Sequence, residues 1–166
     1  MRKLYTYVPQ ENTVLAEGLL SPAKCHNELK HYQRRAGCED KAAVLEWLEK
    51  SFNGRSRSVS CLTEPIQWQG NDEMLKGLVT KTVLFSYDLD KLLQDGIVEA
   101  IYCKDGSDAD GGNENFYRVE AEKVDFSPLP WYKCSREKGL LYAVIRHYLL
   151  VLKDGYIPPE YLTRES

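Results

Sequence analysis

Among the residues of this chain that could bind a ligand is one group of basic side chains. It consists of Lys30, Arg34, Arg35, Arg55 and Arg57. Lysine and arginine side chains pair with phosphates, so the group could meet those of a dinucleotide or of RNA. A solvated basic face is the alternative, because the net charge of −3 gives no general attraction to nucleic acid. The chain also has no GxGxxG, P-loop or GxSxG motif, so we expect no glycine-rich nucleotide loop.

Cysteines and histidines suggest two further sites, and the sequence argues against both. A zinc set could be drawn from Cys25, His26, His31 and Cys38. Neighbours such as Cys25 and His26 point to different faces of a helix, and the paired spacing typical of structural zinc is missing. Cys134 and His147 could form a papain-like pair, but no glycine or aromatic signature surrounds Cys134. We therefore predict no metal site and interpret the five cysteines as free thiols, mostly buried.

The acidic loop over residues 105–114 resembles a calcium loop only in part. An EF-hand needs oxygen ligands at positions 1, 3 and 5, glycine at 6 and glutamate at 12. With Gly111 at position 6, Asp108 and Asp110 fall correctly, but Gly106 takes position 1 and Tyr117 takes position 12. We therefore expect a solvated loop between strands.

An α+β fold must position these residues. Helices are expected to begin near Asn12, at Ser21-Pro22 (running to Ala36), at Glu39-Asp40 and at Leu89. Strands are expected over residues 3–8, 58–63, 82–87, 97–103, 116–119 and 148–152. Because helices come early and strands dominate later, we predict a single domain over residues 1–166, with N-terminal helices packed on a mostly antiparallel, twisted sheet. The predicted core contains Trp47, Phe52, Phe85, Leu92, Ile101 and Val151.

Composition excludes several classes of protein. The 166 residues are 43% hydrophobic and 28% charged, which is typical of a globular domain and not of a disordered chain, a collagen or a coiled-coil rod. No apolar run, residues 149–152 among them, approaches the ~20 residues that cross a bilayer. The N-terminal apolar stretch is too short and too polar for a signal peptide. We expect a cytoplasmic protein with no membrane association.

Several segments together resemble the ADP-ribosyltransferase-like superfamily. The opening Leu4-Tyr5-Thr6-Tyr7, followed by Val14-Leu15-Ala16-Glu17-Gly18-Leu19, is similar to that family's first strand and helix. Residues 59–63 resemble the family's second core strand, and residues 83–92 resemble its middle strand and the helix that follows. Residues 150–162, which include Ile157-Pro158-Pro159-Glu160-Tyr161, resemble its last strands. The superfamily includes NAD-dependent toxins, DNA-modifying transferases and RNA 2′-phosphotransferases.

The resemblance implies three site positions. A His or Arg on the family's first strand holds the NAD ribose or phosphate, and a Ser, Thr or Tyr on the second positions the nicotinamide side. A Glu near the last strand stabilises the oxocarbenium-like transition state. The matching positions here are Thr6, then Ser60 or Thr63, then Leu149 or Leu150. Leucine cannot stabilise positive charge, and Glu64 or Glu160 could substitute for the glutamate only from positions that do not match. The resemblance therefore implies a diverged member with another mechanism or an inactive binder, with an active transferase as the alternative.

We therefore expect a cleft that binds a nucleotide, either NAD or the end of a nucleic acid. The residues expected to bind it are Tyr5, Tyr7, Arg57, Ser60 and Arg34. The candidates for catalytic roles are Tyr7, Ser60 and His147, and Arg146 is expected to face the same cleft as His147. Convergence of the three catalytic candidates on one cleft would favour the nucleotide hypothesis, and scatter would favour its alternative.

The alternative is a non-catalytic protein-interaction module, for example a toxin–antitoxin or phage-defence component. Its feature is the segment Pro128-Leu129-Pro130-Trp131-Tyr132, whose aromatic residues could dock a protein partner. A proline-fixed strap over the sheet would explain the same segment.

Overall fold

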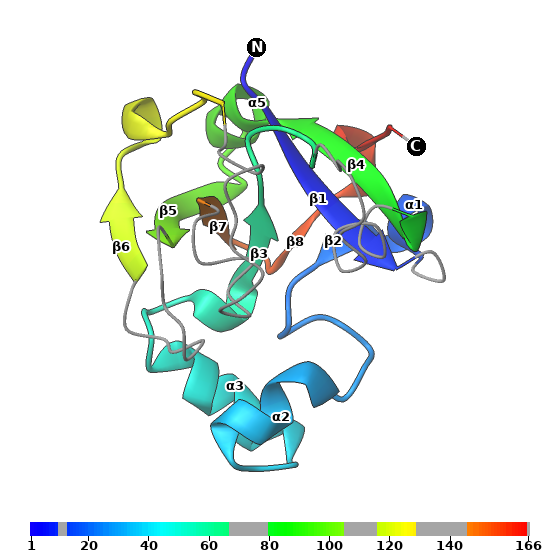
Figure 1. Cartoon of the computed structure of the whole chain (residues 1–166), viewed down its shortest axis with the longest axis vertical. Coiled ribbons are helices and arrows are strands. Elements are labelled where there is room, and N and C mark those ends of the chain that lie inside the picture. Colours follow the sequence, from blue (N-terminus) through cyan, green and yellow to red (C-terminus); the bar gives the residue numbers. More distant parts are fainter. Residues whose placement is uncertain (10–12, 67–79, 105–115, 129–145, 166) are drawn as a thin grey trace, which may run out of the picture.

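The computed structural model describes residues 1–9, 13–66, 80–104, 116–128 and 146–165. Within these ranges the chain forms an antiparallel α+β fold, as the sequence predicts. Two sheets make up most of it (Figure 1). None of the helices in the described ranges is both long and apolar enough to cross a membrane.

Each of the two larger sheets is built from strands distant in sequence. The first has the order β1-β4-β9, and the second has the order β3-β7-β5-β6. Their bounds are β1 (Lys3–Pro9), β4 (Thr82–Asp88), β9 (Thr163–Arg164), β3 (Ser58–Cys61), β7 (His147–Leu152), β5 (Val98–Lys104) and β6 (Phe116–Val119). A small third sheet pairs β2 (Leu19–Leu20) with β8 (Tyr156–Ile157).

A single bridge joins the two larger sheets where β1 meets the end of β3. Tyr5 and Leu62 exchange both of their backbone hydrogen bonds there, each at 2.8 Å. The two sheets separate beyond this bridge, and a cavity lies between β1 and β3 beside it.

Helices lie at the ends of the molecule. The α-helices are α1 (Val14–Glu17), α2 (Lys30–Ala36), α3 (Lys41–Glu49) and α5 (Leu89–Gln94), and the 3-10 turns are η1 (Arg55–Arg57), η2 (Ala121–Lys123) and η5 (Pro159–Tyr161). In Figure 1, α2 and α3 lie together at the lower end, opposite α5. The Asp40 side chain caps α3 by accepting from the Ala43 amide, and Asp88 caps α5 in the same way through the Asp90 amide.

The core has two parts because β7 is covered on both faces. Leu150 and Leu152 join the main core, while Leu149 and Val151 alternate to the opposite face and pack with Phe52. This double burial explains the continuous apolar run of β7. The predicted core residues are buried except Trp47, which is half-buried beside α2.

The predicted helix from Ser21 to Ala36 is wrong in its first half. Only Lys30–Ala36 is helical, and the preceding residues form turns. The Asn27 side chain accepts a hydrogen bond from the Leu29 amide at 2.9 Å, and Leu29 adopts a positive φ of 58°. That left-handed backbone cannot continue a helix, and burial of Leu29, 2% exposed, holds it in place.

Candidate functional site

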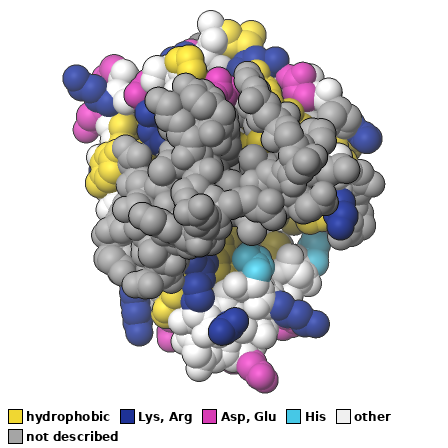
Figure 2. All heavy atoms as spheres, viewed as in Figure 1, with side chains coloured by type: hydrophobic (Ala, Val, Ile, Leu, Met, Phe, Trp, Pro, Cys, Tyr) yellow, Lys and Arg dark blue, Asp and Glu magenta, His cyan; other side chains and the backbone are white. Residues whose placement is uncertain are grey.

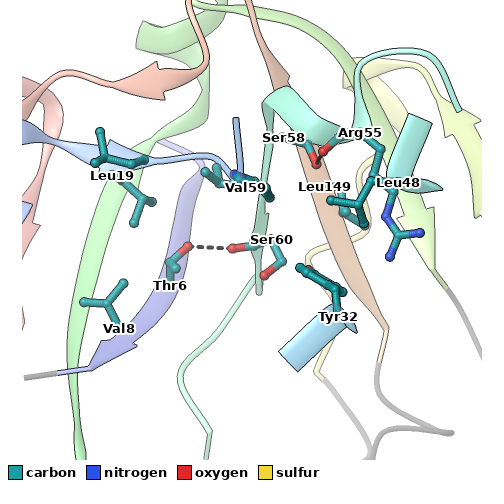
Figure 3. Close-up of a pocket in the computed structure, with 12 residues that line it drawn as sticks. Thr6, Val8, Leu19, Tyr32, Leu48, Arg55, Ser58, Val59, Ser60 and Leu149 are labelled. Atoms are coloured by element: carbon teal, nitrogen blue, oxygen red, sulfur yellow. Dashed lines mark hydrogen bonds between the residues drawn. The ribbon is translucent and has the colours of Figure 1, made fainter. Parts of the chain in front are cut away.

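A cavity of about 170 Å³ opens where β1 and β3 diverge (Figure 3). Its apolar wall comes from β1, β2, α3 and the two strands β3 and β7. The lining residues are Thr6, Val8, Leu19, Leu20, Pro22, Tyr32, Leu48, Arg55, Ser58, Val59, Ser60 and Leu149. Figure 3 shows Val8 and Leu19 on one side of this pocket, and Ser60, Tyr32 and Arg55 toward the other. Leu48 and Leu149 lie on this second side too, so the pocket is mainly apolar with a few polar groups.

Thr6 joins the two sheets at the floor of the pocket. Its hydroxyl donates to the Ser60 carbonyl oxygen at 2.8 Å. Because that proton is used, the Tyr87 hydroxyl, 2.7 Å away, donates to Thr6 in turn. Tyr87 is 2% exposed, and burial raises its pKa well above the ordinary value. The Thr6 hydroxyl therefore serves the internal structure.

The same network reaches a buried thiol. Cys61 hydrogen-bonds to Tyr87, and burial raises the pKa of Cys61 to about 12. A thiol with that pKa carries almost no thiolate at neutral pH, so Cys61 is not a nucleophile.

Arg55 places a buried positive charge at the edge of the pocket, with its guanidinium directed away from Thr6 and Ser60 (Figure 3). It is 6% exposed, and its guanidinium carbon lies 4.6 Å from the centre of the Phe116 ring and 5.8 Å from that of Trp47. The guanidinium also donates to the Ser51 hydroxyl. Burial lowers the pKa of Arg55, but an arginine remains charged at any physiological pH. A cation fixed in this way favours an anionic ligand.

The turn η1 that carries Arg55 is held by Glu49. The Glu49 carboxylate accepts hydrogen bonds from the backbone amides of Gly54, at 2.9 Å, and Ser56, at 2.7 Å. Burial alone would raise the pKa of Glu49, but these amides outweigh it and the pKa is lowered. Gly54 has a φ of 98°, and a Cβ there would lie 2.6 Å from a Val151 methyl group, so glycine is required.

The chemistry available to this pocket is binding. Hydroxyls of Ser60 and Tyr32 and the Arg55 guanidinium suit phosphate or ribose oxygens, and the apolar wall suits a base. No carboxylate is among the described residues that line it. Among the described lining residues, none can stabilise an oxocarbenium-like transition state as a carboxylate does.

The structure brings together one residue at each of the three positions implied by the family resemblance. Thr6 and Ser60 line the pocket, and Leu149, which pairs with Ser60 across β3 and β7, lines it too. Of the alternatives, Leu150 lies in the main core and Thr63 is not among the lining residues.

The predicted binding residues Tyr5 and Tyr7 lie on the other face of β1. Side chains alternate along a strand, so Leu4, Thr6 and Val8 face the interior and Tyr5 and Tyr7 face away from it. The Tyr7 hydroxyl accepts from the Ile66 amide at 2.9 Å, and burial raises its pKa.

The other predicted residues also lie outside the lining. Arg57 donates to Glu99 at 3.0 Å and to the Leu152 carbonyl at 3.1 Å. Arg34 is exposed on α2, His147 opens β7, and Arg146 pairs with Asp125 at 2.9 Å. Tyr7, Ser60 and His147 therefore do not converge on this pocket, and by the criterion set out for these three residues this scatter favours the protein-interaction alternative. Their catalytic roles stay predictions, and a nucleotide site has to be argued from the other residues that line the pocket.

Some predictions fall outside the described residues. These are the loop over residues 105–114, Cys134, and residues 129–132 of the proline-aromatic segment, of which only the exposed Pro128 is described. The protein-interaction hypothesis built on that segment stays a prediction.

Sequence reasoning missed two lining residues, Tyr32 and Arg55. Arg55 was counted in the basic group, but its sequence context of Asn53-Gly54 and three serines resembles any exposed turn. The sequence feature that could have indicated an ordered turn at Arg55 is Glu49, whose carboxylate accepts from the backbone of that turn.

Comparison of the chain with protein-family models, with curated proteins and with solved structures gave no match. The resemblance to the ADP-ribosyltransferase-like superfamily therefore depends on the sequence segments quoted above.

Proposed function

We propose that this protein is a diverged ADP-ribosyltransferase-like domain that binds a nucleotide in the pocket between β1 and β3 without transferring ADP-ribose. The observation that carries the proposal is the meeting of Thr6, Ser60 and Leu149 at one cavity beside the buried cation Arg55. These are the strand positions at which the family handles NAD.

The polar groups of the pocket support a phosphorylated sugar as the ligand. The Arg55 guanidinium carries a positive charge that attracts phosphate, and the Ser60 and Tyr32 hydroxyls can bond ribose or phosphate oxygens. Pockets that enclose a whole drug-sized ligand measure about 300–1,000 Å³. A cavity of about 170 Å³ would therefore hold one end of a nucleotide and leave the rest at its mouth.

Two substitutions support the absence of transfer chemistry. Leu149 presents a hydrocarbon side chain where the family has its glutamate, and Thr6 commits its hydroxyl to Ser60 and Tyr87. Binding energy would remain, but the electrostatic stabilisation of the reacting ribose would be lost.

Isothermal titration with ADP-ribose and with NAD tests the proposal. Hydrogen bonds to a charged group contribute about 1.5–3 kcal/mol, so Arg55→Gln should weaken binding about 10- to 150-fold. Arg57→Gln is the matched control, because Arg57 belongs to the same turn but pairs with Glu99 outside the pocket. Binding of neither compound, or equal losses in the two variants, would contradict the proposal. NAD turnover by the native protein would contradict its non-catalytic part.

A further inference from the structure

The helix α2 is unusually basic for an element beside a pocket. Its seven residues include Lys30, Arg34 and Arg35, contain no acidic residue, and include none that is buried. Lys30 and Arg34 are one turn apart on the exposed side. Neither forms an ion pair within the described part of the chain. Figure 2 shows Lys and Arg side chains spread over the lower end of the molecule, where α2 and α3 lie in Figure 1.

Aromatic rings connect this helix with the pocket. Tyr32 belongs to α2 and also lines the cavity, and its ring centre lies 6.3 Å from that of Trp47 on α3. The guanidinium of Arg35 lies 5.6 Å from the Tyr32 ring and 5.9 Å from the Trp47 ring. The guanidinium of Arg55, a residue that also lines the pocket, lies 5.8 Å from the Trp47 ring. Cations and rings therefore alternate from the exposed helix inward.

Alternating cations and aromatic rings are the features with which proteins bind unpaired nucleic acid. Bases stack on the rings and backbone phosphates pair with the cations. A mononucleotide in the pocket would leave Lys30 and Arg34 without a phosphate, whereas a longer strand would supply one for each. Half-buried rings such as Tyr32 and Trp47 are accessible to an unpaired base and not to a stacked base pair.

We propose that α2 binds the backbone of a single-stranded polynucleotide whose terminal nucleotide occupies the pocket. This inference rests on the proposed function, because it names the class of molecule to which the bound nucleotide belongs. DNA and RNA share this chemistry, so the experiment includes both.

The test is fluorescence anisotropy with 3′-labelled oligonucleotides of two, six and twelve nucleotides, in oligo-dT and oligo-rU series, and with a twelve-base-pair duplex. We expect affinity to rise from two to twelve nucleotides, in one series or both, and the duplex to bind more weakly than the better single strand. On single strands each neutralised phosphate changes the slope of log affinity against log salt by about 0.7, so Lys30→Gln/Arg34→Gln should lower its magnitude by about 1.4.

The matched control removes two charges elsewhere. Lys91→Gln/Lys123→Gln alters exposed lysines of α5 and η2, at the end of the molecule opposite α2 (Figure 1). This variant should keep the native slope. An unchanged slope in Lys30→Gln/Arg34→Gln, the same loss in both variants, or affinity that does not rise with length would overturn the inference.

Titration with ADP-ribose separates the two proposals. Lys30→Gln/Arg34→Gln should bind ADP-ribose as the native protein does, because both residues lie outside the pocket. ADP-ribose binding without length-dependent oligonucleotide binding would overturn only the polynucleotide inference. Failure of the native protein to bind either class would overturn both proposals.

Discussion

Replacing Thr6 with valine tests whether this position serves the structure and not the ligand. Valine keeps the shape of the side chain but removes the hydroxyl that accepts from Tyr87 and donates to the Ser60 carbonyl. Tyr87 is 2% exposed, so water cannot replace the lost partner, and its hydroxyl keeps only the Cys61 sulfur, a weak hydrogen-bond partner. An unsatisfied buried group costs about 1–3 kcal/mol, and the exposed Ser60 should add little.

The expected effect is measurable by thermal and urea unfolding. For a protein of 150–250 residues each kcal/mol shifts Tm by about 2–4 °C, so Thr6→Val should lower Tm by about 2–12 °C. In a double-mutant cycle with Tyr87→Phe, the double variant should lose less stability than the two single variants together, because both remove the same hydrogen bond.

Thr63→Val provides the control. Thr63 is 9% exposed, and its hydroxyl has no hydrogen-bond partner among the described residues. Its removal should leave stability unchanged or raise it slightly, since no bond is lost. If Thr6→Val costs no more than Thr63→Val, or if the cycle with Tyr87→Phe is strictly additive, the Thr6 hydroxyl does not have the structural role assigned to it.

Three further predictions concern the frame of the pocket. Gly54→Ala should lower the free energy of unfolding by about 1–2 kcal/mol because of the left-handed backbone alone, and the Val151 contact should add to this loss. Urea unfolding measures the effect, and an unchanged midpoint would refute the requirement for glycine at this position. Because the pKa of Glu49 is lowered on folding, its stabilisation is present above the unfolded value near 4.5 and disappears as pH falls through the folded value. Unfolding measured from pH 7 to pH 3 should therefore show a smaller acid-side loss in Glu49→Gln, and identical pH profiles would contradict the Glu49 cap. Cys61, buried with a pKa of about 12, should remain unmodified when the native protein is treated with iodoacetamide at pH 8 and analysed by mass spectrometry; rapid alkylation would show that the thiol is accessible.

Most strands could be predicted from sequence because their signals are local. Alternating or β-branched runs such as residues 3–8 and 82–87 identify strands, and the caps Asp40 and Asp88 mark helix starts. The failure at Ser21–Leu29 has a tertiary cause, since burial of Leu29 in a left-handed conformation overrides a plausible helix start.

The pocket was harder to predict because it depends on which face of each strand a side chain occupies and on contacts between residues distant in sequence. The residues that carry the resemblance include Thr6, Ser60 and Leu149, which line one pocket. The predicted binding residues Tyr5 and Tyr7 take no account of the alternation along β1, which turns them away from it. Arg55 becomes a pocket residue only when Trp47 and Phe116 from separate segments cover it, and no local pattern encodes that contact.

The most direct test of nucleotide binding in this pocket is an ¹H–¹⁵N NMR titration with ADP-ribose. The account predicts saturable shifts of the amide signals of Arg55, Ser60 and Leu149, with the amide of Lys123 on the distant η2 turn unmoved. Absence of saturable shifts, or shifts confined to residues outside the pocket, would contradict the proposal that this cavity binds a nucleotide.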